Sequence, residues 1–146
     1  MGAGVRRCLA GLSVALTAAG AVACGGSSST APPAATPPSS TQTFSGTVPV
    51  AGSVVVSFTV TVAGEVDITL TAAGPPPNIM MGLFLGNPAA TGGSTCLALP
   101  GGSVTTSAGS VPQLLGTAPA GAYCVQIYDV GNQVAPVTYA LTITHS

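Results

Sequence analysis

Lysine and arginine are almost missing from this sequence. Of its 146 residues only two carry a permanent positive charge, and both of them, Arg6 and Arg7, precede the first apolar run. Proteins bind nucleic acids and nucleotides largely through such cations, because these neutralise phosphate groups and release their counterions. We therefore expect no nucleic acid and no nucleotide among the partners of this protein.

Acidic and aromatic side chains are also scarce. The three carboxylates, Glu65, Asp67 and Asp129, are too few and too dispersed to supply the six or more oxygen ligands of a calcium site. With no tryptophan and three tyrosines, the sequence offers little for a planar aromatic platform of the kind that binds carbohydrate. Neither kind of site is predicted from composition.

The polar residues that an enzyme would need have simpler interpretations. His145 is the only histidine and stands next to the last residue, where we expect a mobile polar side chain instead of a general base. Glu65 and Asp67 share one face of a strand beside a turn, which favours a solvated edge. Asp129 opens "DVGNQ", a turn in which a carboxylate accepts hydrogen bonds from nearby amides. We predict no catalytic residue, no metal site and no cofactor.

Residues 1–23 have the layout of a secretory signal. Two arginines precede an apolar stretch from Leu9 to Val22, which is shorter than the roughly 20 residues of a membrane span. Two cleavages compete at "AVAC". Cleavage by ordinary signal peptidase would leave a free Cys24. The same residues resemble a bacterial lipobox, with Ala21 in place of the commonest Leu, and this resemblance predicts a lipidated Cys24. Lipidation is favoured because it removes an exposed thiol and provides a palmitate-type anchor.

A linker follows the cysteine. Residues 24–42 are rich in Gly, Ser and Pro, a composition that cannot bury a core and is typical of a disordered tether. We expect this tether to hold a folded domain, residues 43–146, away from the membrane surface.

Beyond Thr43 the apolar residues alternate with a period of two, which predicts half-buried strands. In "SVVVSFTVTV" the inward set is Val54, Val56, Phe58, Val60 and Val62, and in "EVDITLTA" it is Val66, Ile68 and Leu70. Six further strands are expected at 43–50, 79–85, 95–99, 113–116, 122–130 and 137–144. About eight short strands separated by Gly and Pro turns predict an all-β fold, a two-sheet β-sandwich of Greek-key or jelly-roll type.

The remaining cysteines form a pair. If Cys8 is removed with the signal and Cys24 is lipidated, Cys96 and Cys124 are left in an oxidising compartment, where a disulfide is expected. Each lies out of phase with the core residues of its own strand, such as Leu97 and Leu99 for Cys96, so both thiols are expected on one sheet surface. A metal site is disfavoured because it needs more ligands.

Met80 and Phe84 are candidates for a partner surface. Met80 and Phe84 form one set of side chains on this strand, and Ile79, Met81, Leu83 and Leu85 form the other. One of the two sets faces solvent, unless other parts of the protein cover both faces of the strand. An exposed apolar set would mark a partner surface.

The folded part resembles a known family. The segments "TFSGTVPVAGSVVVSFTV", "GEVDITLTA", "GLFLG" before "CLAL", and "PAGAYCVQIYDVGNQVAPVTYALTIT" look like the bacterial pre-peptidase C-terminal (PPC) domain and its stand-alone lipoprotein relatives. The most specific elements are Gly121, Tyr123 and Val125, followed by the closing Tyr139, Leu141 and Ile143. The resemblance implies a non-catalytic β-sandwich module of exported proteins that assists targeting or surface binding.

These observations lead to one expected function. We expect a non-catalytic lipoprotein of the bacterial cell envelope, anchored in a membrane through Cys24 and presenting a binding or structural module to an envelope protein or a polysaccharide. The alternatives are a secreted hydrolase-accessory domain or weak hydrolytic enzyme, and a secreted binding domain without lipid.

Overall fold

The computed structural model of the chain describes residues 38–90 and 94–146, which are all-β and contain no helix. The predicted signal segment, Cys24 and most of the predicted tether lie outside these residues. Within them, no helix is long and apolar enough to span a membrane. The strands are β1 (Ser40–Val48), β2 (Ser53–Val60), β3 (Gly64–Gly74), β4 (Met81–Pro88), β5 (Cys96–Thr106), β6 (Leu114–Ala118), β7 (Gly121–Asp129) and β8 (Val137–His145).

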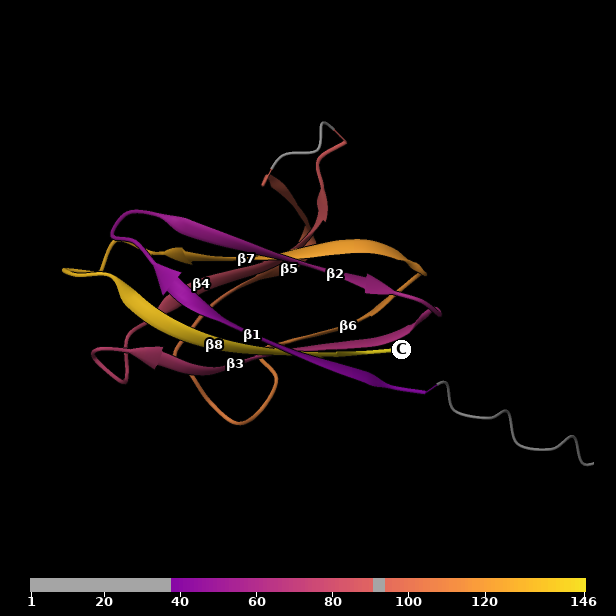
Figure 1. The fold of residues 1–146 in the computed structure, drawn as a ribbon, viewed down its shortest axis with the longest axis horizontal. Coiled ribbons are helices and arrows are strands. Elements are labelled where there is room, and N and C mark those ends of the chain that lie inside the picture. Colours follow the sequence, from indigo (N-terminus) through magenta and orange to yellow (C-terminus); the bar gives the residue numbers. More distant parts are fainter. Residues whose placement is uncertain (1–37, 91–93) are drawn as a thin grey trace, which may run out of the picture. The chain divides into compact units, whose positions relative to one another are not determined.

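The strands form two antiparallel four-stranded sheets. Their orders are β1-β8-β3-β6 and β2-β7-β4-β5, and Figure 1 shows the two sheets as layers. Consecutive strands mostly alternate between the sheets, and this order is that of an eight-stranded jelly roll. The predicted all-β sandwich is therefore confirmed.

The core lies between the two sheets and follows the predicted alternation. Because the side chains of a strand point to opposite faces in turn, every second residue of a strand faces the other sheet. The fully buried side chains include Val66, Ile68, Leu70, Leu141 and Ile143 from one sheet and Val60, Met81, Leu83, Val125 and Ile127 from the other. Burial of this apolar surface is the main force that holds the sheets together.

Strand ends were predicted less well than strand faces. The prolines after Gly74 end β3, because proline cannot donate to a ladder. However, β1 begins at Ser40 instead of Thr43, and β5 continues to Thr106, well beyond Leu99. The prediction that Val62 faces the core is wrong: β2 ends at Val60, and the Val62 side chain is 48% exposed in the turn that follows.

His145 is not a mobile residue, and that prediction is also wrong. It pairs with Ser40 of β1 on one side and with Val66 of β3 on the other, so β8 is held in the sheet up to its last residue. Its side chain is 3% exposed, and its ring packs against that of Phe58 with centroids 5.4 Å apart. Pairing on both edges prevents the fraying that is usual near a chain end.

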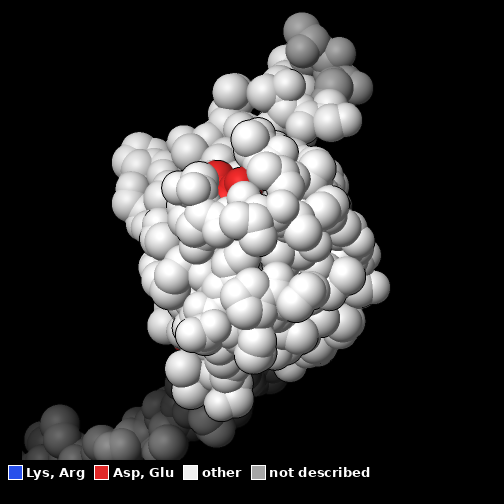
Figure 2. All heavy atoms as spheres, turned by 90° about the vertical axis from the view of Figure 1, so that its left-hand side faces the viewer, with Lys and Arg blue, Asp and Glu red and all other residues white. Residues whose placement is uncertain are grey.

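The surface carries very little charge. The described residues contain three carboxylates and neither lysine nor arginine. Figure 2 looks onto the end of the sandwich where β1 turns into β2 and β7 leads to β8, and it shows one small acidic area on an otherwise uncharged surface. The outward positions of the strands are instead occupied mainly by threonine and serine.

Candidate functional site

Cys96 and Cys124 form a disulfide on the outer face of the β2-β7-β4-β5 sheet. Their Cα atoms are 5.8 Å apart, and the bond joins β5 to β7 across β4, the strand between them. As predicted, Cys124 is out of phase with the buried Tyr123 and Val125. The phase of Leu97, next to Cys96, predicted a core residue. This prediction is wrong, because the Leu97 side chain is 57% exposed.

Gly86 allows the disulfide to cross β4. It lies opposite Cys124 in the β4–β7 ladder and opposite Ala98 in the β4–β5 ladder. A Cβ atom at this position would lie 2.8 Å from the Cys96 sulfur and 2.3 Å from the Leu97 carbonyl oxygen. Only a residue without a side chain fits here, because the Leu97 backbone and the Cys96 sulfur occupy the space.

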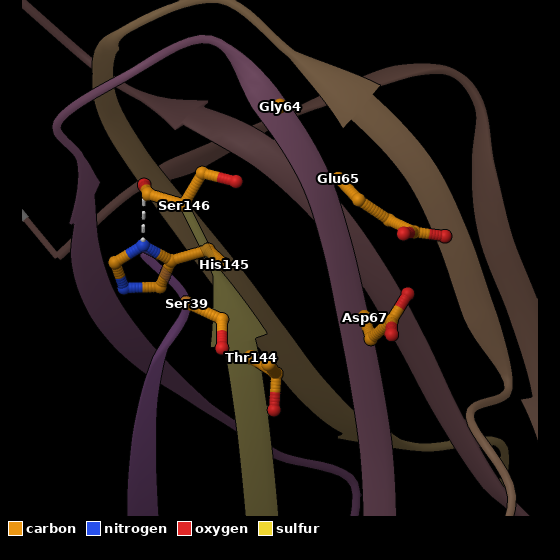
Figure 3. A pocket seen from close by; sticks show the side chains of 7 residues that line it. All are labelled: Ser39, Gly64, Glu65, Asp67, Thr144, His145 and Ser146. Carbon is orange, nitrogen blue, oxygen red and sulfur yellow. Dashed lines mark hydrogen bonds between the residues drawn. The ribbon is translucent and has the colours of Figure 1, made fainter. Parts of the chain in front are cut away.

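Three of the four polar residues considered as catalytic candidates, Glu65, Asp67 and His145, line one pocket of about 290 Å³, whereas the fourth, Asp129, does not. Figure 3 shows the pocket and labels the residues that line it, which are Ser39, Gly64, Glu65, Asp67, Thr144, His145 and Ser146. Glu65 and Asp67 are on the outer face of β3, whereas the buried His145 belongs to the inward set of β8. In Figure 3 the imidazole points away from the two carboxylates, which lie on the same side of the pocket.

This arrangement does not assemble an acid–base pair. The ring nitrogens of His145 lie 3.1 Å from the side-chain nitrogen of Gln42 and 3.1 Å from the backbone oxygen of Ser146, not beside a carboxylate. Asp67 Oδ1 is buried and has no hydrogen-bond partner among the described residues, but Asp67 has only Glu65 as an acidic neighbour in the pocket. Within 38–90 and 94–146, no three metal-binding side chains come together. General acid–base chemistry needs a base within hydrogen-bond reach of its partner.

A second pocket, of about 330 Å³, lies on the outer face of the β2-β7-β4-β5 sheet. Phe84 of β4 and Tyr128 of β7 form its aromatic part, with ring centroids 6.1 Å apart and ring planes inclined by 52°. The other residues that line it are Ala51, Gly52, Ser53, Gln126 and Asp129. The pocket therefore combines two aromatic rings with an amide, a hydroxyl and a carboxylate.

Gly82 determines how the Tyr128 ring lies. The two residues face each other in the β4–β7 ladder, and a Cβ atom on Gly82 would lie 2.2 to 2.5 Å from three carbons of the ring. The ring therefore rests on the bare backbone of Gly82. A bulkier residue at this position would push it off the sheet.

Asp129 closes the pocket at the loop end of β7. Its Oδ2 accepts a hydrogen bond of 2.8 Å from the backbone N–H of Ala51, and its Oδ1 accepts bonds from the N–H groups of Gly131, Asn132 and Gln133. The predicted turn role of Asp129 is thus present, with an additional bond to the β1–β2 turn. The hydrogen bond from Ala51, followed by those from the turn amides, lowers the pKa of Asp129 despite some desolvation, so the carboxylate is charged at neutral pH.

The proposed partner-surface residues have different positions. Phe84 is half-buried on the outer face and lines the second pocket. Met80 precedes β4, is 40% exposed, and its carbonyl oxygen accepts a hydrogen bond from the Asn132 side chain, but it does not line the pocket.

Tyr128 and Gln126 were missed by the sequence analysis. Their signal was present, because both share the phase of Cys124 and alternate with the buried Val125 and Ile127. What the sequence did not contain was the pairing of β7 with β4, which brings Tyr128 to Gly82 and Phe84.

No protein-family model matches this chain, and no curated protein sequence is significantly similar to it. The resemblance to the PPC domain stays a prediction from the quoted segments.

Proposed function

We propose that this protein is a non-catalytic lipoprotein of the bacterial cell envelope, which presents its β-sandwich as a binding module on a tether anchored through a lipidated Cys24. The observation that carries the proposal is the Cys96–Cys124 disulfide, with its Cα atoms 5.8 Å apart and Gly86 beneath it. Disulfides persist in oxidising compartments and are rare in the cytosol. The predicted signal of residues 1–23 agrees with such a location.

The membrane attachment rests on the sequence around Cys24 and on simple energetics. Each buried CH₂ group of an acyl chain contributes about 0.8 kcal/mol, so two or three chains hold a protein firmly where one does not. The first strand begins at Ser40. The segment rich in Gly, Ser and Pro between Cys24 and this strand would give the module reach above the membrane.

The non-catalytic part of the proposal rests on geometry. His145 faces the core and packs on Phe58, while Glu65 and Asp67 face outward on another strand. Asp129 is occupied by four backbone amides. His145 and Asp129 therefore have structural roles, and the imidazole does not lie beside either carboxylate of β3, which supports a binding module over a hydrolase.

Cell fractionation tests the proposal. The full chain is expressed in a bacterial host as wild type, as Cys24→Ser and as Cys8→Ser, and membranes are separated from soluble fractions. We expect the wild type and Cys8→Ser in the membrane fraction, released only by detergent, because Cys8 lies in the removed signal. Cys24→Ser should no longer be found in the membrane fraction that detergent releases. A wild type found in the cytosol with Cys96 and Cys124 reduced would contradict the proposal.

A further inference from the structure

We infer that the outer face around Tyr128 binds a neutral saccharide, with the Tyr128 ring as a stacking platform and Gln126, Ser53 and Asp129 as hydrogen-bonding groups. This inference rests on the proposed binding function and specifies its ligand. It concerns the pocket of about 330 Å³ on the β2-β7-β4-β5 sheet.

The first argument is the orientation of the aromatic rings. Tyr128 rests on the backbone of Gly82, so one face of its ring is directed to the sheet and the other is available to a ligand. Tyr128 and Phe84 are both partly exposed, and their planes are inclined by 52°, which gives the pocket a floor and a side wall. The face of an aromatic ring is negative and attracts C–H groups, which a pyranose ring presents on its flat faces.

The second argument is the set of polar groups beside the rings. Among the residues that the structure describes, the side chains of Gln126 and Ser53 and the Tyr128 hydroxyl make no hydrogen bond, although each lies in the pocket. Asp129 Oδ2 accepts one bond, from Ala51, whereas Oδ1 accepts three. Oδ2 therefore keeps capacity for another donor, such as a sugar hydroxyl. Few polar groups at fixed positions next to an apolar surface are typical of a ligand site.

The third argument comes from the ligands that this pocket does not suit. An anion would meet the Asp129 carboxylate and no lysine or arginine, since the sequence has none after Arg7. A peptide strand cannot add here, because β7 and β4 are inner strands with both edges paired. A calcium ion needs six or more oxygen ligands and would find one carboxylate. A neutral polyhydroxylated ligand uses every group that is present.

The Cys96–Cys124 bond also supports a fixed site. Cys124, Gln126 and Tyr128 follow one another on the outer face of β7, and Gly86, Phe84 and Gly82 follow one another on β4. The disulfide ties the far end of this part of β7 to β5, which is itself paired with β4. A rigid pair of strands holds the rings and the amide in one arrangement, which reduces the entropy lost when a ligand binds.

Saturation-transfer NMR and calorimetry on the full-length protein, extracted from membranes in detergent, test this inference. The probes are neutral oligosaccharides built on glucose, mannose, galactose or xylose. We expect at least one of them to bind, with an affinity that Tyr128→Ala reduces by about tenfold or more. Gln126→Ala keeps both rings and should reduce the affinity about threefold or more. Leu115→Ala, an exposed residue on the other sheet, is the matched control and should bind like the wild type.

Several results would overturn the inference. These are no binding by any probe, unchanged binding by Tyr128→Ala or Gln126→Ala, and loss of binding in Leu115→Ala. The intact mass of the same sample separates this inference from the proposed anchor. An acylated protein that binds no saccharide contradicts the saccharide site alone, whereas an unacylated protein that binds one contradicts the anchor alone.

Discussion

The backbone N–H of Ala51 donates a hydrogen bond of 2.8 Å to Oδ2 of Asp129, a residue 78 positions later in the sequence. This bond ties the β1–β2 turn to the end of β7, while Oδ1 of the same carboxylate organises the turn that leads to β8. Ala51 has a φ of 53°, which is unusual for a residue with a side chain. One carboxylate thus stabilises two turns at the same end of the sandwich.

The charge of Asp129 makes stability dependent on pH. The hydrogen bond from Ala51 and those from the turn amides lower the pKa of Asp129 below its usual 3.8. A carboxyl group whose pKa is lower in the folded state stabilises the fold above its unfolded pKa, and this contribution is lost as the pH falls through the lowered value. We expect Asp129→Asn to be less stable than the wild type at pH 7, and the difference to shrink below pH of about 3.8.

Thermal unfolding followed by circular dichroism measures this effect. Thr47→Ser, an exposed substitution on β1, is the control and should keep the pH dependence of the wild type. A stability difference between Asp129→Asn and the wild type that is equal at neutral and acid pH would show that the charge is not responsible.

The disulfide should contribute strongly to stability. It closes a loop with a sequence separation of 28, for which the chain-entropy relation gives about 3 to 4 kcal/mol. We expect the double variant Cys96→Ser/Cys124→Ser to unfold at a correspondingly lower urea concentration. Under reducing conditions the wild type and the double variant should become nearly equal. If they instead differ as much with reductant as without it, the loss comes from the serine substitutions and not from the bond.

Two glycines provide a matched test of the space beneath the disulfide. A Cβ atom on Gly86 would lie 2.3 Å from the Leu97 carbonyl oxygen, which is backbone and cannot turn away, whereas one on Gly116 meets nothing within 4 Å. We expect Gly86→Ala to lower the free energy of unfolding by about 1 to 3 kcal/mol. Gly116→Ala should be neutral or stabilising by up to about 1 kcal/mol. Equal effects of the two substitutions in urea unfolding would contradict this account of Gly86.

Two leucines test the location of the core. Leu83 on β4 is fully buried between the sheets, and Leu115 on β6 is 67% exposed. Leu83→Ala should cost about 2 to 5 kcal/mol because it removes buried methylene groups and leaves a cavity. Leu115→Ala should change stability by less than about 0.5 kcal/mol. A larger loss for Leu115→Ala in the same unfolding experiment would place the core elsewhere.

The faces of most strands could be predicted from the sequence, with Leu97 of β5 as an exception, but their ends could not. Alternation identified Val66, Ile68 and Leu70 as inward residues because burial on one face imposes a period of two. The same pattern continued to Val62, where the chain had already left the sheet to begin a turn. A period describes which side a residue faces within a strand and contains no information on where hydrogen bonding stops.

The candidate site could not be predicted in full, because it is formed by contacts between strands that are far apart in the sequence. His145 was misjudged because its neighbours, Ser40 and Val66, become neighbours only through the jelly-roll order. Tyr128 was missed for the same reason, since the glycine that seats its ring lies on another strand. The disulfide was predictable because the sequence predicts export to an oxidising compartment, where cysteines usually pair, and because the predicted fates of Cys8 and Cys24 left one pair.

The intact mass of the protein purified from bacterial membranes tests the central claim most directly. We predict a chain that begins at Cys24, carries the added mass of acyl chains, and shows the Cys96–Cys124 bond by a gain in mass on reduction. A chain of unmodified mass with a free thiol at Cys24 would contradict the lipid anchor on which the proposed function depends.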